Sequence, residues 1–202
     1  MIATILIFVI FIIYLTGYLW YVRILYKKQI IKSWFIYFSI LLLFPILIIN
    51  SSILSAFFNE NLSYFRNLWI WFTLLGILFL VSGARMMQLA NRLLSKSNKS
   101  YSTEKIFKQM RFPRYSALFL IYYGLAILLD SFIGILFIPV FMILLEIIVY
   151  IEEKRVLLKK YKKSYENYIQ KTTSKLFPNP YNYVLIIITV LIFYVGFLNL
   201  FL

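Results

Sequence analysis

Long apolar runs separated by shorter polar segments make up most of the chain. Six runs have the length of membrane spans, and they cover residues 2–21, 34–57, 68–90, 115–129, 132–151 and 183–202. Most are near the roughly 20 residues that a helix needs to cross a hydrocarbon core about 30 Å thick. The runs show no strand-like alternation, and a helix satisfies all of its own backbone groups in lipid. We therefore predict an all-α polytopic membrane protein with about six transmembrane helices.

The fourth and fifth runs predict a helical hairpin, because Asp130 and Ser131 between them are typical of a tight turn. After the hairpin, residues 152–171 predict a basic amphipathic helix that lies on the inner membrane surface. Its apolar face has positions spaced by four, four and three residues, and these are Leu157, Tyr161, Tyr165 and Tyr168. Pro178 and Pro180 end this helix before the last run.

Basic residues gather in alternate connections between the runs. Residues 22–33, 92–114 and 154–175 hold four, seven and eight of them, which is 19 of the 21 lysines and arginines. Because cytoplasmic loops carry an excess of lysine and arginine, we predict that these loops are cytoplasmic and that both chain ends lie outside. The net charge of +14 then follows from topology, with lipid as the partner and no need for nucleic acid. The expected location is an integral, multi-pass position in the plasma or inner membrane.

The composition removes several kinds of site. The chain contains no cysteine and no histidine. Disulfides, thiolate nucleophiles, Ser-His triads and most zinc sites are therefore excluded, and we predict no metal ion. The composition is 63% hydrophobic and only 14% charged, so polar side chains that cluster are of special interest.

One such cluster lies at the cytoplasmic end of the predicted hairpin. Arg111 and Arg114 open the fourth run, and Glu152 and Glu153 follow the fifth. Because a hairpin brings these two ends together, we expect the arginines and glutamates to lie within one helix-packing distance. Taken singly, an arginine at a helix end or a glutamate beside a lysine is an ordinary surface feature. Their concentration in one place indicates a site.

The stretch from Arg111 to Pro178 resembles the C-terminal core of the isoprenylcysteine carboxyl methyltransferase family. The family's opening pattern, Arg-His-Pro-x-Tyr-x-Gly, is matched at Arg111, Pro113 and Tyr115. Its second pattern, Glu-Glu-x-x-Leu-x-x-x-Phe-Gly-x-x-Tyr-x-x-Tyr, follows the hairpin and aligns with Glu153, Leu157, Tyr161, Tyr165 and Tyr168.

The chain departs from the family pattern at several positions. Phe112 replaces the histidine, and Ala117 and Lys162 each replace a glycine. The second glutamate of the pattern falls on Lys154, unless Glu152 and Glu153 form the pair.

The resemblance implies a membrane methyltransferase that moves a methyl group from S-adenosylmethionine to a lipid-linked or small hydrophobic acceptor at the cytoplasmic interface. It implies one integral-membrane domain, with N-terminal helices at 1–82, a methyltransferase-like core at 83–180 and an additional transmembrane helix at 181–202. An acceptor that is already an anion needs no general base, so a site without histidine is compatible with this reaction.

The resemblance also implies roles for individual residues. Arg111 and Glu153 form the implied catalytic pair: Arg111 binds the methionine carboxylate, and Glu153 or Glu152 accepts a hydrogen bond from a ribose hydroxyl or the amino group. The other implied cofactor-binding positions are the motif proline and four aromatic residues, namely Pro113, Phe112, Tyr115, Tyr161 and Tyr165.

Two other functional classes remain open on the sequence. One is a reductase that uses NADPH, because membrane sterol reductases are similar in the same hairpin region. The other is a non-catalytic membrane protein that retains the fold. Glu146 is a further open question: an acid inside a span is either functional or paired, and Arg85 in the third run is the candidate partner.

Overall fold

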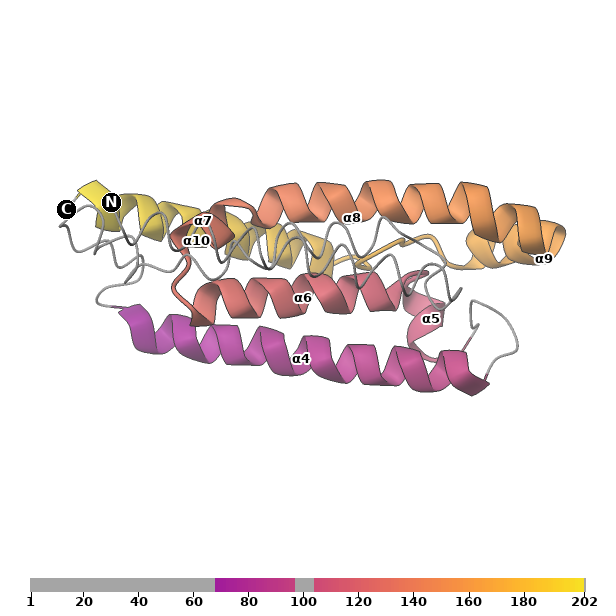
Figure 1. Ribbon diagram of the computed structural model, residues 1–202, viewed down its shortest axis with the longest axis horizontal. Helices are drawn as coiled ribbons and strands as arrows, with labels where there is room; N and C mark the ends of the chain where they lie inside the picture. The colour runs from indigo at the N-terminus through magenta and orange to yellow at the C-terminus, as the bar shows by residue number, and fades with distance from the viewer. Residues whose placement is uncertain (1–67, 97–103, 202) are drawn as a thin grey trace, which may run out of the picture.

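The computed structural model describes residues 68–96 and 104–201, and these form helices joined by short connections (Figure 1). In chain order the elements are α4 (Trp69–Lys96), α5 (Ile106–Gln109), α6 (Pro113–Leu128), α7 (Phe132–Leu136), α8 (Ile138–Glu152), the π-helix η3 (Glu153–Leu157), α9 (Leu158–Lys171) and α10 (Tyr181–Phe201). No strand occurs among the described residues, so the all-α class is confirmed for them. The predicted runs at 2–21 and 34–57 lie outside the described residues.

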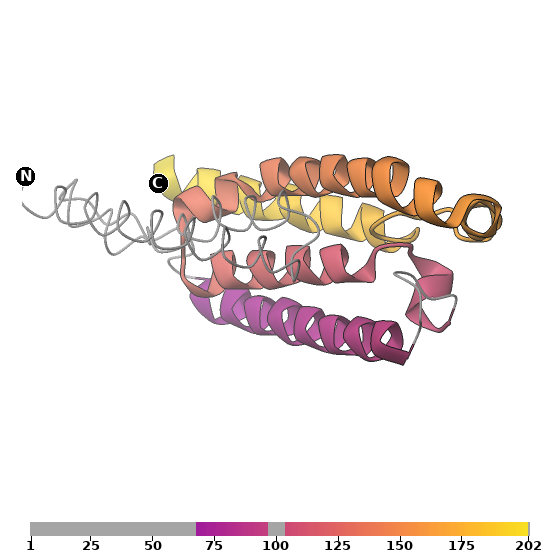
Figure 2. The ribbon, with the colours of Figure 1, turned by 45° about the vertical axis from the view of Figure 1, so that its right-hand side comes forward.

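The helix α6 lies at the centre of the bundle. It runs antiparallel to α4 on one side, and α8 lies along its other side (Figures 1 and 2). After α9 the chain returns through residues 172–180 and enters α10, which runs back beside α8. The short helix α5, η3 and α9 gather at the end of the bundle where α4 finishes and α6 begins.

Glycines bring the backbones of α4 and α6 together. A Cβ atom added to Gly124 would lie 2.7 Å from the carbonyl oxygen of Gly76 and 2.8 Å from the backbone nitrogen of Leu80. One added to Gly83 would lie 2.9 Å from the carbonyl oxygen of Ala117. Small residues of this kind permit the close helix contacts on which membrane bundles depend, because lipid gives helices no hydrophobic reason to associate.

Aromatic residues of α6 connect it to every neighbour. Tyr123 stacks on Phe79 of α4 with ring centroids 4.8 Å apart, and its hydroxyl shares a 3.0 Å hydrogen bond with Thr189 of α10. The hydroxyl of Tyr122 donates to the carbonyl oxygen of Gly134 at 3.1 Å. Both tyrosines are fully buried, and buried tyrosines of this kind normally have a hydrogen-bond partner.

The predicted hairpin is present, but its second arm is interrupted. Asp130 adopts a positive φ of 47°, and the hydroxyl of Ser131 accepts a hydrogen bond from the backbone nitrogen of Gly134 to cap α7. The helix then restarts as α8, because Pro139 has no N–H to donate to the carbonyl of Ile135. The single fifth helix expected from the sequence is therefore two helices.

The basic amphipathic helix is also less regular than its pattern predicts. It starts as the π-helix η3 and continues as α9. Inside α9, Lys162 has φ 41° and ψ −126°, which breaks the helical path into two pieces. This is the position at which the family pattern has glycine, the residue that adopts such angles without strain.

One described helix is long and apolar enough to cross a membrane, and it spans Trp69–Ser95 in α4. The apolar helices Pro113–Leu128 and Tyr181–Val195 are shorter. Large apolar side chains face outward on α4 and α10, including Trp69, Trp71, Leu74, Leu78, Ile187, Val190 and Leu191. Six spans, the orientation of the loops and the division at residues 82 and 180 stay predictions.

Candidate functional site

The start of α6 is held against the segment that follows α9. The backbone nitrogens of Arg111 and Phe112 donate to the carbonyl oxygens of Ser174 and Lys175, both at 3.0 Å. Pro113 then begins α6, where its missing N–H costs nothing because the first turn of a helix has no intrahelical acceptor for it. These bonds place the side chain of Arg111 between α8 and the 172–177 segment.

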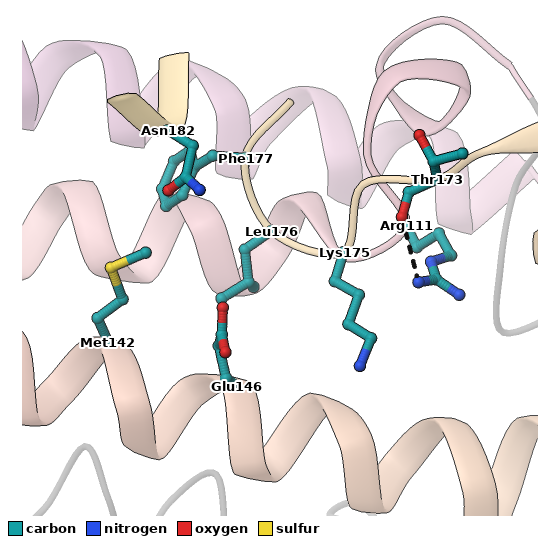
Figure 3. Close-up of a pocket in the computed structure, with 8 residues that line it drawn as sticks. All are labelled: Arg111, Met142, Glu146, Thr173, Lys175, Leu176, Phe177 and Asn182. Carbon is teal, nitrogen blue, oxygen red and sulfur yellow. Dashed lines mark hydrogen bonds between the residues drawn. The ribbon is translucent and has the colours of Figure 1, made fainter. Parts of the chain in front are cut away.

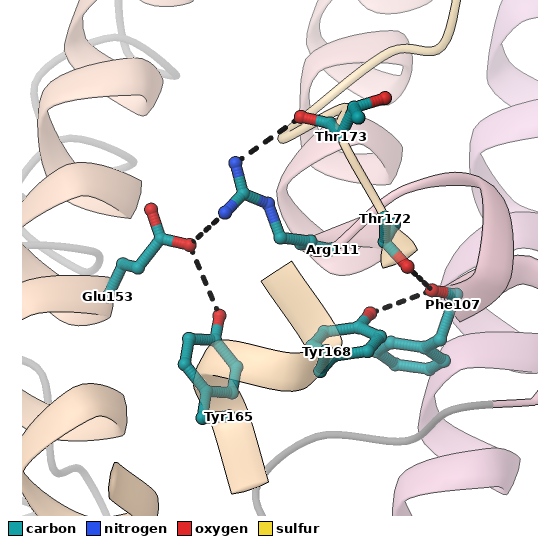
Figure 4. Close-up of polar contacts among 7 residues, drawn as sticks. All are labelled: Phe107, Arg111, Glu153, Tyr165, Tyr168, Thr172 and Thr173. Atoms are coloured by element: carbon teal, nitrogen blue, oxygen red, sulfur yellow. Dashed lines mark hydrogen bonds and ion pairs between the residues drawn. The ribbon is translucent and has the colours of Figure 1, made fainter. Parts of the chain in front are cut away.

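Arg111 forms a buried ion pair with Glu153. Its Nη1 donates to Oε1 of Glu153 at 2.5 Å, and its Nη2 donates to the carbonyl oxygen of Thr173 at 3.4 Å (Figure 4). The two residues are 7% and 6% exposed, which confirms that the hairpin brings them together. Because an unpaired charge is very unfavourable at such burial, each of these groups depends on the other.

Tyrosines of α9 complete the surroundings of this pair. The hydroxyl of Tyr165 donates to Oε1 of Glu153 at 3.4 Å. Burial raises the pKa of the Tyr165 hydroxyl, and the charge of Glu153 raises it further, so the hydroxyl stays protonated and can donate. The hydroxyl of Tyr168 donates to the carbonyl oxygen of Phe107 at 2.7 Å, which connects α9 to α5.

Glu152 makes a separate contact. It accepts a short hydrogen bond from the hydroxyl of Tyr115 in α6. Burial raises the pKa of the Glu152 carboxyl, whereas the Tyr115 hydrogen bond and the positive charge of Arg114 lower it. Adjacent glutamates thus bind two different partners on α6 and just before it, and Lys154 is exposed. Both glutamates therefore contact residues at the start of α6, and their register in the family pattern stays a prediction.

A cavity of about 260 Å³ lies on the other side of Arg111 (Figure 3). Its lining comes from α8, from residues 173–177 and from the first turn of α10, and comprises Arg111, Met142, Glu146, Thr173, Lys175, Leu176, Phe177 and Asn182. Among the described side chains, two buried polar atoms have no hydrogen-bond partner, and they are Nε of Arg111 and Oδ1 of Asn182. Both belong to residues of this cavity.

These two atoms are available to a ligand or to ordered water, because buried polar groups in proteins are nearly always hydrogen-bonded. One is a donor and the other an acceptor. Lys175 and Glu146 extend toward the same space from opposite sides (Figure 3). The cavity therefore presents a positive and a negative charge together with one unused donor and one unused acceptor.

The structure separates the predicted site residues into two groups. Arg111 is the only one of them that lines the cavity. Glu153, which binds both Arg111 and Tyr165, supports it, and Glu152 with Tyr115 forms a separate hydrogen bond nearby. Outside both groups, Phe112 is buried with its ring 5.9 Å from that of Tyr115, Pro113 begins α6, and Tyr161 lies beneath the ammonium group of Lys160 at 5.1 Å.

The structure also adds residues that sequence reasoning missed. Thr173, Lys175 and Asn182 were not predicted, although Asn182 is a polar residue directly before the predicted last run and could have been noticed. Glu146 faces the cavity, and the one ion pair among the described residues is Arg111–Glu153. The alternative pairing of Glu146 with Arg85 is therefore wrong, since α4 packs on α6 and Arg85 is exposed.

Comparison with known proteins gives one match. Residues 60–164 match the family model described as phospholipid methyltransferase. No curated protein and no solved structure matches the chain. The matched range includes the α4–α6 contact, the hairpin and the glutamate pair, and it ends before Tyr165 and the cavity residues from Thr173 onward.

Proposed function

The chain belongs to the phospholipid methyltransferase family, and from this premise we propose that it transfers a methyl group from S-adenosylmethionine to a lipid-linked or small hydrophobic acceptor at the cytoplasmic membrane interface. The family match covers about half of the chain and agrees with the resemblance to membrane methyltransferases seen in the motifs.

The observation that carries the proposal is the pair of unused polar atoms in one cavity. An α-amino acid group has a carboxylate and an ammonium on the same carbon, so it needs a donor and an acceptor close together. Nε of Arg111 and the ammonium of Lys175 offer donors for the carboxylate. Glu146 and Oδ1 of Asn182, which lies at the other end of the cavity from Arg111 (Figure 3), offer acceptors for the ammonium. The charges of Lys175 and Glu146 have the signs that match the carboxylate and the ammonium. The methionyl end of S-adenosylmethionine fits this set of groups.

The size of the cavity supports the same assignment. Pockets that enclose a complete drug-sized ligand are about 300–1,000 Å³, and this cavity measures about 260 Å³. It therefore suits the methionyl end of the donor, while the apolar side chains of Met142 and Phe177 line the rest of its wall.

The support behind Arg111 explains how this chain would position the donor. Glu153 and the Thr173 carbonyl each accept a hydrogen bond from one terminal nitrogen of the guanidinium, which fixes the plane of the group and leaves Nε without a protein partner. When bound, the donor supplies an electrophilic methyl group on a sulfonium. The contribution of the protein is to hold donor and acceptor in line, where most of the catalysis of such a transfer originates.

Substitution of Asn182 tests the assignment. Asn182→Leu removes the unused acceptor without a large change in volume, so S-adenosylhomocysteine should bind about 10- to 150-fold more weakly, the value of one hydrogen bond to a charged group at about 1.5–3 kcal/mol. The melting temperature without ligand should not fall, because no hydrogen bond to Oδ1 is lost. Isothermal titration calorimetry of the full chain in detergent measures the first effect, and thermal unfolding the second.

Tyr183→Leu, at an exposed neighbouring position, is the matched control and should change neither quantity. If the wild-type chain does not bind S-adenosylhomocysteine, the methyltransferase assignment fails. If it binds NADPH instead, the reductase class replaces it.

A further inference from the structure

A second cavity lies at the end of the bundle, away from Arg111. It has a volume of about 490 Å³ and is lined by Lys108 of α5, by Ser164, Asn167, Tyr168 and Lys171 of α9, and by Thr172. None of its lining residues belongs to the proposed donor cavity, so the two cavities are separate sites.

The walls of this second cavity are fixed by hydrogen bonds. The hydroxyls of Tyr168 and Thr172 both donate to the carbonyl oxygen of Phe107, at 2.7 and 3.4 Å. The ring of Phe107 is buried against Ala90 and Leu93 of α4. The cavity is therefore connected through α5 to the end of the longest apolar helix of the described chain.

The groups left to bind a ligand are positive or neutral donors. Lys108 and Lys171 contribute two ammonium groups, and Asn167 contributes an amide. No acidic residue lines the cavity, and the ion pair found among the described residues does not involve either lysine. Two uncompensated cations beside an amide donor favour an anion with several acceptor oxygens, and phosphate is the commonest group of this kind.

We propose that this cavity binds the phosphate of an anionic phospholipid head group. The position favours a lipid over a soluble phosphate, because α5 and α9, which line the cavity, lie at the end of the bundle where the apolar helix Trp69–Ser95 finishes. Head groups occupy that depth in a bilayer. Basic groups close to an anionic leaflet also gain from its surface potential.

The site goes beyond methyl transfer. A bound head group at α5 and α9 would connect the two elements that flank the Arg111–Glu153 pair, since Phe107 and Tyr168 lie at their contact. Anionic lipid would thus stabilise the end of the bundle independently of the methyl donor.

Native mass spectrometry of the full chain, released from an uncharged detergent, tests the proposal. The probes are dioleoyl-phosphatidylglycerol and, as the zwitterionic comparison, dioleoyl-phosphatidylcholine. Wild type should retain one phosphatidylglycerol in preference to phosphatidylcholine. In the double variant Lys108→Gln/Lys171→Gln the apparent dissociation constant for phosphatidylglycerol should rise about 30-fold, since each basic residue near an anionic lipid contributes about a fivefold factor.

The double variant Lys159→Gln/Lys163→Gln is the matched control, because it removes the same charge from exposed positions of the same helix outside the cavity. It should retain the lipid as wild type does. An equal loss in both double variants would show attraction to the whole basic surface and overturn the site. Displacement of the lipid by an equal concentration of inorganic phosphate would overturn the lipid assignment in favour of a soluble phosphate.

Discussion

Helix α6 meets α4 on one side and the α8–α9 arm on the other, and different chemistry makes the two contacts. The α4 side is a contact of glycine backbone and apolar side chains, with Gly76, Gly83 and Gly124 at the points of closest approach. The α8–α9 side is polar at the end where α6 begins, and there Arg111 and Tyr115 bind the two adjacent glutamates. Each side therefore fails for a different reason when it is altered.

The two contacts differ in whether they leave polar groups available to bind a ligand. The glycine contact leaves no space, and none of its groups is available to bind anything else. In the polar contact only some of the hydrogen-bonding groups have partners. Glu153 is bonded to Arg111, whereas Nε of Arg111 has no partner. We infer that α4 and α6 form the fixed frame, and that the α8–α9 arm and the segment after it carry recognition.

The largest expected effect concerns the ion pair. Glu153→Gln leaves Arg111 as a buried charge without its partner, so the free energy of unfolding should fall by about 3–5 kcal/mol, as measured by denaturation in detergent. Glu166→Gln, at an exposed position of α9, makes the same chemical change and should have no measurable effect.

The double variant Arg111→Met/Glu153→Leu decides whether the pair stabilises the fold or serves the cavity. It should recover much of the lost stability, because replacing both members of a buried pair by apolar residues is often neutral. The double variant should nevertheless not bind S-adenosylhomocysteine, because it lacks Nε of Arg111. If the double variant still binds S-adenosylhomocysteine, the Arg111–Glu153 pair serves only the fold, and the polar side of α6 has no role in recognising the donor.

The next effect concerns the glycine contact. Gly124→Ala places a methyl group against the backbone of α4, at 2.7 Å from the Gly76 oxygen. Because backbone atoms there cannot move aside singly, we expect a loss of about 1–3 kcal/mol in thermal or denaturant unfolding, the usual cost of overpacking. Ala84→Leu, on the exposed side of α4, adds more volume and should cost far less. Similar losses in the two variants would contradict the close contact.

Much of the frame could be predicted from the sequence. The helices that correspond to the third, fourth and sixth runs, the hairpin turn at Asp130 and the meeting of Arg111 with Glu153 follow from local signals, namely apolar length, turn residues and adjacency across a hairpin. These features depend on residues close in sequence or on one short connection.

The cavity could not be predicted in the same way. It forms because residues 172–180 fold back along α6 and α8, a path set by the bonds from Arg111 and Phe112 to Ser174 and Lys175. Periodicity does not report such long-range backbone pairing. For the same reason Asn182 looked like part of a helix boundary, whereas in the fold it faces Glu146 across the cavity region (Figure 3).

The smallest expected effect concerns Lys162, at which α9 bends. Its φ of 41° and ψ of −126° lie in a region that only glycine adopts freely, and a strained residue of this kind costs about 1–3 kcal/mol. Lys162→Gly should relieve that strain and, after the entropy cost of glycine, raise the free energy of unfolding by about 1 kcal/mol. Lys163→Gly, one position on in the regular part of α9, should instead lower it by about 1 kcal/mol. Opposite signs at adjacent lysines, measured by chemical denaturation, are the result expected if the backbone at Lys162 is strained. Equal losses at both positions would mean that α9 is a continuous helix without a strained residue at Lys162.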